Sequence, residues 1–358
     1  MKNTKICLHA MVGNEEKVIL RMLESCYQHI DYYVIQCNGN DTTEKIINNF
    51  FSEKNISGFT YQIDWNFPGW NRDHALQVCL KCDHECDWIL RMDADEQLKV
   101  EDNFDWSILD DNDIQSWNIT ADSPGSFYFR TWLWNAKLSW TFKHDKRHEC
   151  ILLNGTENFQ RVNLPREFRH IITNDGETWV NPTKFLSDAL ELENHHISQG
   201  TLLNDPYHFF YVSKSYNDCY GNDVFPLKYE HQKEYARRCI FYGQQFVDYI
   251  NKPDEMVYYA QYLVGNAYKF CKDYSNAILA YNKADKFCPR RNEHYCGLAE
   301  VYCEIKEYEK MLEYTKVLMQ SERTNPFPEL ALFLIHNGCY HDTGEYIQHL
   351  HNLALANV

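Results

Sequence analysis

The chain has 358 residues, a formal net charge of −16, and a composition that is 44% hydrophobic, 24% charged and 15% aromatic. This apolar and aromatic content excludes a disordered chain, and the length exceeds what one ordinary core fills, so two domains are expected. The acidic balance argues against nucleic acid as a partner, because the phosphate backbone is also negative.

The sequence contains no stretch that is long and apolar enough to span a bilayer. The N-terminus also lacks the basic and then apolar layout of a signal peptide. We therefore expect a cytoplasmic protein without a transmembrane segment, whose 14 cysteines are reduced thiols.

Strand and helix patterns alternate over the first part of the chain. Short apolar runs of strand length cover residues 6–12, 32–37, 59–65 and 88–92. Helical patterns lie between them, at about 18–26, 42–51 and 72–82. Strands that alternate with helices form a mainly parallel sheet with helices on its faces, so we expect an α/β domain over residues 1–180.

The carboxyl ends of the expected strands mark the candidate site, because ligands bind beyond these ends in parallel sheets. The residues at those ends, or in the loops beside them, are 11–15, 36–41, 69–73 and 93–96. Farther along the chain, residues 126–140 show a β-rich pattern that predicts a hairpin or a platform beside the sheet.

Helical periodicity takes over from about Pro182, and an internal repeat of about 34 residues indicates tetratricopeptide-like helix pairs. The matched positions are Gly265 and Ala299, Tyr268 and Tyr302, Tyr274 and Tyr308, and Ala277 and Met311. Weaker units are expected at 207–219 and 327–353. We therefore expect an all-α domain over residues 181–358, which either binds a protein partner or another subunit, or only braces the first domain.

Two aspartates after the fourth expected strand carry the strongest chemical signal. Asp93 and Asp95 are separated by one residue at the end of an apolar run. Paired carboxylates make a hard, oxygen-rich site for Mg²⁺ or Mn²⁺. A divalent ion held there can neutralise the charge of a diphosphate as it leaves.

Short motifs surround these aspartates in a fixed order. In one-letter code they read MVGNEE, RMLES, FPGWNRDHAL, DWILRMDADE, RHE and NDGETWVNPTKFLSDALELE, at residues 11–16, 21–25, 67–76, 87–96, 147–149 and 174–193. The series resembles family 2 glycosyltransferases of the GT-A fold that are fused to tetratricopeptide repeats, and it covers most of the chain. The resemblance implies a Rossmann-like, mainly parallel sheet and a metal-assisted, inverting sugar transfer.

The resemblance also implies a role for each motif. The residues that would hold the nucleotide sugar are Met11, Val12, Asn14, Glu15, Gln36, Asn38, Asp41, Arg72, Met92, Asp93 and Ala94. Within this set, Arg72 would pair with the diphosphate, because a guanidinium matches phosphate oxygens in a bidentate manner. Asp95 would bind the metal directly, while Asp93 would contact the ribose or a metal-bound water and Asn174 would be a further ligand.

An inverting transfer also needs a carboxylate that takes the proton from the acceptor hydroxyl. Glu149 is the first candidate for this base, with a structural ion pair as its alternative role, and Asp175 is the second candidate.

Two positions depart from the family pattern. Gln36 stands where the family usually has an aspartate that contacts the nucleotide base, which makes a uridine donor less certain. Asn174 stands where the family has a histidine, and His144, His148 and His170 are nearby in sequence as substitute ligands.

The sequence thus predicts an enzyme that transfers a sugar from a UDP- or GDP-sugar to a hydroxyl of a glycan or small glycoside, with Mn²⁺ or Mg²⁺ as cofactor. The alternative is a repeat scaffold or binding protein with an inactive transferase domain, which the changes at Gln36 and Asn174 favour. A nucleotidyltransferase is the weaker rival, because residues 11–17 contain one glycine and an acidic pair rather than a glycine-rich loop.

Overall fold

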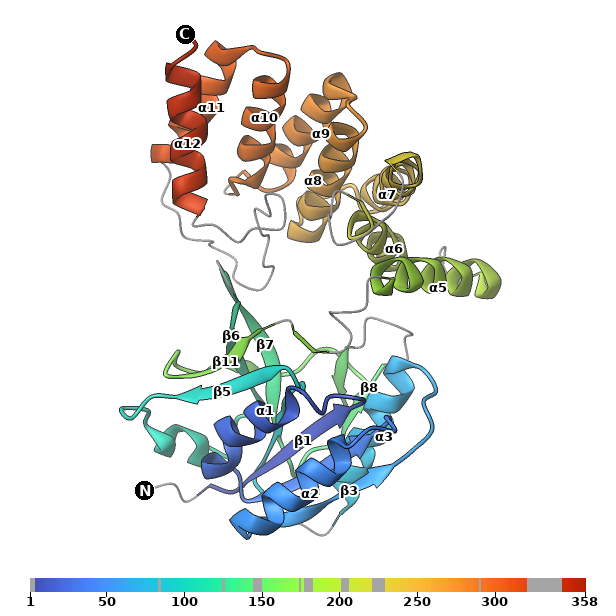
Figure 1. Ribbon diagram of the computed structural model, residues 1–358, viewed down its shortest axis with the longest axis vertical. Helices are drawn as coiled ribbons and strands as arrows, with labels where there is room; N and C mark the ends of the chain where they lie inside the picture. The colour runs from blue at the N-terminus through green and yellow to red at the C-terminus, as the bar shows by residue number, and fades with distance from the viewer. Residues whose placement is uncertain are drawn as a thin grey trace. The chain divides into compact units, whose positions relative to one another are not determined.

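The chain divides into two compact units, Met1–Asn181 and Pro182–Val358, each with its own hydrophobic core. The computed structural model describes residues 4–82, 85–123, 126–143, 150–173, 175–176, 183–200, 206–220, 229–289, 291–320 and 343–358. The first unit is mixed α/β with a curled sheet, and the second is a helical, repeat-like region (Figure 1). These features confirm the predicted change from an α/β part to an all-helical part.

The main sheet of the first unit has nine strands, of which eight lie side by side in the order β3-β2-β1-β4-β7-β6-β11-β5. These strands are β1 (Ile6–Val12), β2 (Tyr32–Cys37), β3 (Ser57–Gln62), β4 (Trp88–Arg91), β5 (Glu96–Val100), β6 (Ser116–Ser123), β7 (Ser126–Asn135) and β11 (Phe168–Ile172). The first four are parallel, whereas β7 runs antiparallel to both β4 and β6. Strand β10 (Arg161–Asn163) pairs with β6, and β8 (Trp140–Phe142) pairs with β9 (Ile151–Leu153) in a separate ribbon.

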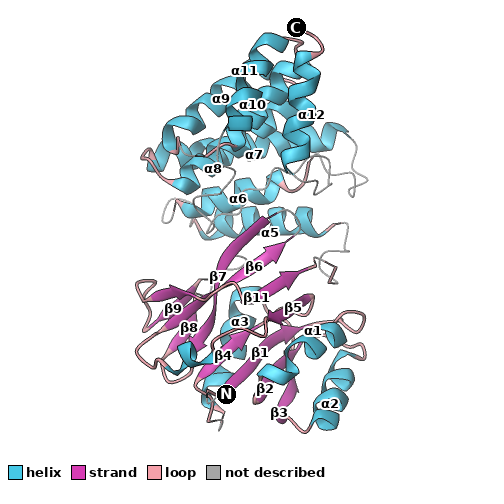
Figure 2. Ribbon diagram, turned by 90° about the vertical axis from the view of Figure 1, so that its left-hand side faces the viewer, coloured by secondary structure: helices cyan, strands magenta, loops and turns pink. Residues whose placement is uncertain are grey.

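Helices cover both faces of the parallel strands, as Figure 2 shows. They are α1 (Ile19–Cys26), α2 (Thr43–Lys54) and α3 (Pro68–Lys81), with short 3₁₀ turns at Tyr27–His29 and Trp106–Asp110. Alternate side chains of β1 pack against the helices on opposite faces of the sheet, because successive side chains of a strand point to opposite faces. Ile6 and Leu8 pack in the cluster that contains α1 and α2, whereas Cys7 packs in the cluster that contains α3.

Two predicted boundaries in this unit were wrong. Strand β3 ends at Gln62, although the pattern continued to residue 65. Helix α3 begins at Pro68 rather than residue 72, because a proline is tolerated in the first helical turn, where its missing N–H is not needed. Of the two alternatives for the β-rich pattern at 126–140, the platform is wrong: residues 126–135 form β7 inside the main sheet, where it pairs antiparallel with the preceding β6, as the strand of a hairpin does, and with β4.

The elements described in the second unit are all helices. They are α5 (Lys184–Gln199), α6 (Tyr207–Asn217), α7 (Tyr229–Ile250), α8 (Glu255–Phe270), α9 (Tyr274–Phe287), α10 (Glu293–Glu304), α11 (Tyr308–Gln320) and α12 (Thr343–Leu355). Helices α8 and α9 and then α10 and α11 form the two pairs expected from the internal repeat, with Tyr274 and Tyr308 each starting the second helix. Residues 327–342, which belong to the last predicted unit, lie outside the described ranges.

Close approach of neighbouring helices in this unit depends on small residues. Gly265 of α8 and Gly297 of α10 both pack against the ring of Tyr281 in α9, which is fully buried. A Cβ atom at residue 297 would lie 2.4 Å from the Tyr281 ring, so no side chain fits there without movement of the ring or a helix. Within the described ranges, no helix is long and apolar enough to cross a membrane.

Candidate functional site

The loops that follow β1, β2 and β4 lie at one edge of the sheet (Figure 2). The register explains this, because Val12 pairs with Cys37 and His9 pairs with Arg91, so that the three strands end next to one another. The predicted segments 11–15, 36–41 and 93–96 are therefore anchored on this part of the sheet, whereas 69–73 lies in α3, whose Arg72 comes within 3.7 Å of the Asp93 carboxylate.

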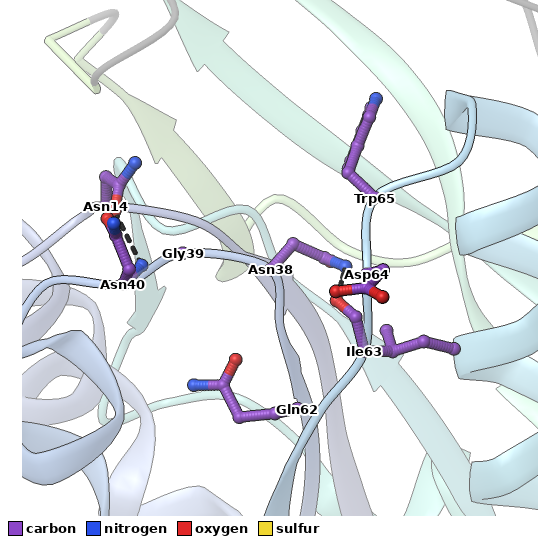
Figure 3. A pocket seen from close by; sticks show the side chains of 8 residues that line it. All are labelled: Asn14, Asn38, Gly39, Asn40, Gln62, Ile63, Asp64 and Trp65. Atoms are coloured by element: carbon purple, nitrogen blue, oxygen red, sulfur yellow. Dashed lines mark hydrogen bonds between the residues drawn. The ribbon is translucent and has the colours of Figure 1, made fainter.

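A pocket of about 630 Å³ lies beyond the ends of β1, β2 and β3. Its lining residues are Asn14, Asn38, Gly39, Asn40, Gln62, Ile63, Asp64 and Trp65. Asn14 and Asn40 stand on one side and the Trp65 ring on the other, as Figure 3 shows. Trp65 is 53% exposed, and the polar side chains around it present amide and carboxylate groups. A ligand with a flat ring and a polar edge would fit this pocket, because the ring can stack on Trp65 while its edge forms hydrogen bonds with the polar side chains.

Asn14, which forms one wall of the pocket, is fixed by its backbone conformation and by a hydrogen bond. Asn14 adopts a left-handed backbone conformation with φ of 57°, and its Oδ1 accepts a hydrogen bond of 3.0 Å from the Asn40 backbone N–H. A Cβ at Gly39 would lie 2.4 Å from the Asn14 nitrogen, so only glycine fits there. Of the residues around the pocket, the sequence predicted Asn14 and Asn38 as site residues. It did not identify Trp65, because residues 63–65 read as the end of a strand.

Gln36 does not line this pocket. Its side chain is fully buried, and all four hydrogen-bonding positions of its amide are occupied within the protein. The partners are Asn38 and Asn71, which accept from Nε2 at 2.9 and 3.3 Å, and Tyr61 and His74, which approach Oε1 at 2.9 and 3.1 Å. The predicted contact with a nucleotide base therefore lacks a free group, and Gln36 instead joins β2 to β3 and α3.

The remaining predicted residues of the first two loops mainly hold the loops together. Both carboxylate oxygens of Asp41 accept backbone N–H groups, from Thr43 at 3.0 Å and from Glu16 at 3.1 Å. Partial burial alone would raise the pKa of Asp41, but these hydrogen bonds lower it, so the group is ionised. Glu15 donates its backbone N–H to the Thr43 hydroxyl at 2.8 Å. Val12 is buried, so its side chain belongs to the core.

The loop after β4 alternates buried and accessible side chains. Met92 and Ala94 are buried, so only their backbone groups are available to a ligand. The Asp93 carboxylate is 36% exposed and lies 3.4 Å from an Arg91 nitrogen and 3.7 Å from an Arg72 nitrogen. Arg72 thus lies beside the aspartate pair, and its contact with a diphosphate stays a prediction.

Asp95 has the electrostatic surroundings of a cation ligand. Burial raises its pKa, and the neighbouring negative charges of Asp93 and Asp175 raise it further. The backbone of Gly176 hydrogen-bonds the carboxylate. A Cβ at Gly176 would come within 3.2 Å of the Asp95 carboxyl carbon, so the glycine makes room for this side chain.

Asp175 is held by an arginine that is remote in sequence. Arg21 of α1 donates to both of its carboxylate oxygens, at 2.9 and 2.5 Å, and Thr173 donates to one of them at 2.7 Å. Arg21 hydrogen bonds lower the pKa of Asp175, in spite of its partial burial. A carboxylate that is paired and made less basic in this way is a poor proton acceptor, so the geometry disfavours the predicted role of Asp175 as a catalytic base.

The described residues supply only part of a metal site. Among them, no group of three or more His, Cys, Asp or Glu side chains is arranged to hold a metal ion. Glu149 and Asn174, the predicted base and third ligand, lie outside the described residues. Oxygen ligands from a diphosphate and from water would suit a cation at Asp95, because Mg²⁺ prefers such mixed sites.

A charged layer beneath the aspartate loop was not predicted. The half-buried Trp132 ring contacts two guanidinium groups, those of Arg91 and Arg130, each 4.2 Å from the ring centroid. Arg130 also pairs with the buried Glu96. Burial raises the pKa of Glu96, which the positive charge of Arg130 opposes. His170, considered as a substitute metal ligand, is fully buried and lies 3.6 Å from the Glu96 carboxylate.

Comparisons with known proteins do not place the chain in a family. No family model matches it, and no curated protein sequence matches it. Among solved structures, a chain of MamA (residues 41 to the end) from Desulfovibrio magneticus RS-1 is similar at 17% identity with a TM-score of 0.24. The similarity covers 41% of this chain and 78% of the MamA chain. A likeness at this level identifies neither the fold nor the function.

Proposed function

We propose that the α/β unit is a glycosyltransferase that moves a sugar from a UDP- or GDP-sugar to a hydroxyl of a glycan or small glycoside. The observation that carries the proposal is the placement of three features at one edge of the sheet: the pocket with its exposed Trp65, Arg72, and the Asp93–Asp95 pair. The four parallel strands extended by antiparallel ones are compatible with the GT-A fold that the motifs resemble.

The proposed binding mode follows from the chemistry of each feature. The nucleoside base stacks on Trp65, and its polar edge is read by the amides around the pocket. Arg72 pairs with the diphosphate, where its neighbour Asp93 keeps the guanidinium in place. Asp95 holds Mn²⁺ or Mg²⁺, which in this position would neutralise the charge on the leaving diphosphate.

In the proposed reaction the acceptor hydroxyl oxygen attacks the anomeric carbon and the bond from that carbon to the diphosphate breaks. Glu149 remains the proposed base that takes the hydroxyl proton, because Arg21 and Thr173 occupy the carboxylate of Asp175. The helical, repeat-like unit is proposed to bind a protein partner or another subunit.

The alternative function is a repeat scaffold with an inactive transferase unit. It is favoured by Gln36, whose four internal hydrogen bonds leave nothing for a nucleotide base at a position where the related family has an aspartate.

A binding experiment on the full chain separates the two functions. Titration calorimetry with UDP, GDP and their sugars, with and without Mn²⁺, is expected to show one nucleotide that binds more tightly with the metal. Trp65→Ala should weaken that binding by about 5- to 150-fold, since stacking on an aromatic ring contributes roughly 1–3 kcal/mol per base. Asp95→Asn should abolish only the dependence on Mn²⁺.

Leu20→Ala is the matched control, because Leu20 is another exposed apolar side chain of the same unit, at 44% exposure. It should bind the nucleotide as the wild type does. A folded wild-type protein that binds none of these nucleotides in the presence of Mn²⁺ would overturn the proposal in favour of the scaffold.

A further inference from the structure

The segment after β11 contacts the Asp93–Asp95 loop from two directions. The Thr173 hydroxyl lies within hydrogen-bonding distance of both the Asp95 backbone carbonyl and the Asp175 carboxylate, to either of which it can donate its one proton, and Gly176 lies against the Asp95 side chain. Arg21 of α1 joins both elements. Its guanidinium donates to Asp175 through two nitrogens, to the Thr173 hydroxyl at 2.7 Å, and to the Asp95 carbonyl at 3.5 Å.

We propose that Arg21 is a positioning residue: through Asp175 and Thr173 it holds the Asp93–Asp95 loop in the geometry in which Asp95 receives the divalent cation. The inference rests on the proposed function and adds to it a residue that contacts neither the nucleotide nor the cation. It assigns Asp175 the role of the group that Arg21 grips, in place of the role of base.

The geometry explains why an arginine is needed. Arg21 presents a planar fork of N–H groups: Nη1 donates to one oxygen of Asp175, while the two N–H groups of Nη2 face the other Asp175 oxygen, the Thr173 hydroxyl and, at 3.5 Å, the Asp95 carbonyl. A lysine has a single ammonium group and cannot bridge all of these acceptors. The loop would then lose its link to α1, although the Thr173 hydroxyl could still reach Asp95.

Arg21 and Asp175 are exposed enough that their ion pair should matter for positioning the loop and little for stability. The side chains of Arg21 and Asp175 are 34% and 46% exposed, and exposed ion pairs contribute little to folding. Loss of Arg21 should therefore leave the unit folded but free the loop that carries Asp95. Catalytic and metal sites respond strongly to such changes, because a displacement of about 1 Å can cost on the order of a hundredfold in function.

The test measures Mn²⁺ affinity at the nucleotide site, using the electron paramagnetic resonance signal of free Mn²⁺ with saturating UDP or GDP, whichever the full chain binds. Arg21→Ala and Asp175→Asn are each expected to weaken Mn²⁺ binding by about tenfold, which is about 1.4 kcal/mol. Arg21→Lys should recover only part of the loss. The double variant should be no weaker than either single variant, because both remove the same link.

Two further readouts distinguish positioning from a general structural role. The affinity for the nucleotide without metal and the midpoint of urea unfolding should both stay at wild-type values in Arg21→Ala. Arg166→Ala is the control, since Arg166 forms an exposed ion pair of 3.0 Å with Asp122 elsewhere in the unit. It should change neither the metal affinity nor the nucleotide affinity.

Gly176→Ala should perturb the same loop while Arg21 is left unchanged. The added methyl group would press on the Asp95 carboxyl carbon at 3.2 Å, so this variant should also weaken Mn²⁺ binding. Mn²⁺ affinity unchanged in both Arg21→Ala and Asp175→Asn would overturn the inference alone. If Arg21→Ala lost metal-free nucleotide affinity and stability as much as it lost Mn²⁺ affinity, the inference would also be overturned. A wild-type chain that binds no nucleotide would instead overturn the proposed function, and this inference with it.

Discussion

At the scale of single residues, burial changes the ordinary acid–base chemistry of His170. His170 is fully buried, and among the described residues neither of its ring nitrogens has a hydrogen-bond partner. Burial, together with the positive charge of Arg130, lowers the pKa of His170 to about 3. The ring is therefore neutral near pH 7, and its approach of 3.6 Å to the Glu96 carboxylate is not an ion pair.

This burial predicts a loss of stability in acid. The pKa of His170 is about 3 in the folded protein and 6.5 for the unperturbed side chain. Between these values the unfolded chain binds more protons, so the free energy of unfolding falls as the pH drops below about 6.5. The slope that His170 contributes is about 1.4 kcal/mol per pH unit. His170→Leu should remove this contribution, so its unfolding free energy should fall less steeply between pH 6.5 and 4.5 in urea titrations. Parallel curves for the two proteins would contradict the prediction.

The residues at strand ends could be placed from sequence, because a parallel sheet brings these ends to one edge whatever the loops contain. Asn14, Asn38 and the two aspartates were found in this way. The partners of the site residues could not be placed. The side-chain oxygen of Gln36 is occupied by Tyr61 of β3 and His74 of α3. Arg21 and Asp175 form hydrogen bonds although they are 154 positions apart in the sequence. Pairings between distant segments leave no periodic pattern in a sequence.

At the scale of elements, predictions succeeded where burial on both faces of a strand produces a continuous apolar run. The strand predicted at 6–12 corresponds to β1, in which six of the seven residues are buried. The end of β3 was missed, because Ile63 and Trp65 continue the apolar alternation while they line a pocket instead of a core. An apolar pattern in a sequence does not distinguish a side chain of the core from one that lines a ligand pocket, because both places use the same residue types.

The helical repeat offers a test at the same scale. In an exposed helix, glycine to alanine stabilises by about 1 kcal/mol. Gly297→Ala should instead destabilise the helical unit by about 1–3 kcal/mol, because the new methyl group would lie 2.4 Å from the Tyr281 ring. Replacement of the ring in a Gly297→Ala, Tyr281→Ala double variant should relieve part of the clash, so the two losses should not add. Chemical unfolding followed by circular dichroism measures this, and a Gly297→Ala protein as stable as the wild type would contradict it.

At the scale of the whole molecule, two cores and two compact units imply separable unfolding. The sequence provides a selective probe, since all 9 tryptophans lie between residues 65 and 179. Tryptophan fluorescence therefore reports on the α/β unit, while the circular dichroism signal at about 222 nm is dominated by the helical unit.

The proposed nucleotide site predicts a selective shift between these signals. The nucleotide with Mn²⁺ should raise the midpoint of the fluorescence transition, because a ligand stabilises only the unit that binds it. The helical transition should stay where it is. If both transitions rise together, the two units unfold as one, and the separate cores do not act independently.

The contacts of Asp95 also set where the first unit can be divided. The main sheet is complete at Ile172, the last residue of β11. Thr173 and Gly176, which contact the aspartate loop, come only after it. A fragment cut at the end of the sheet would keep every strand and both helical layers, yet its acidic loop would have lost its anchor. The shortest piece of this chain that folds and the shortest piece that could work are therefore different lengths.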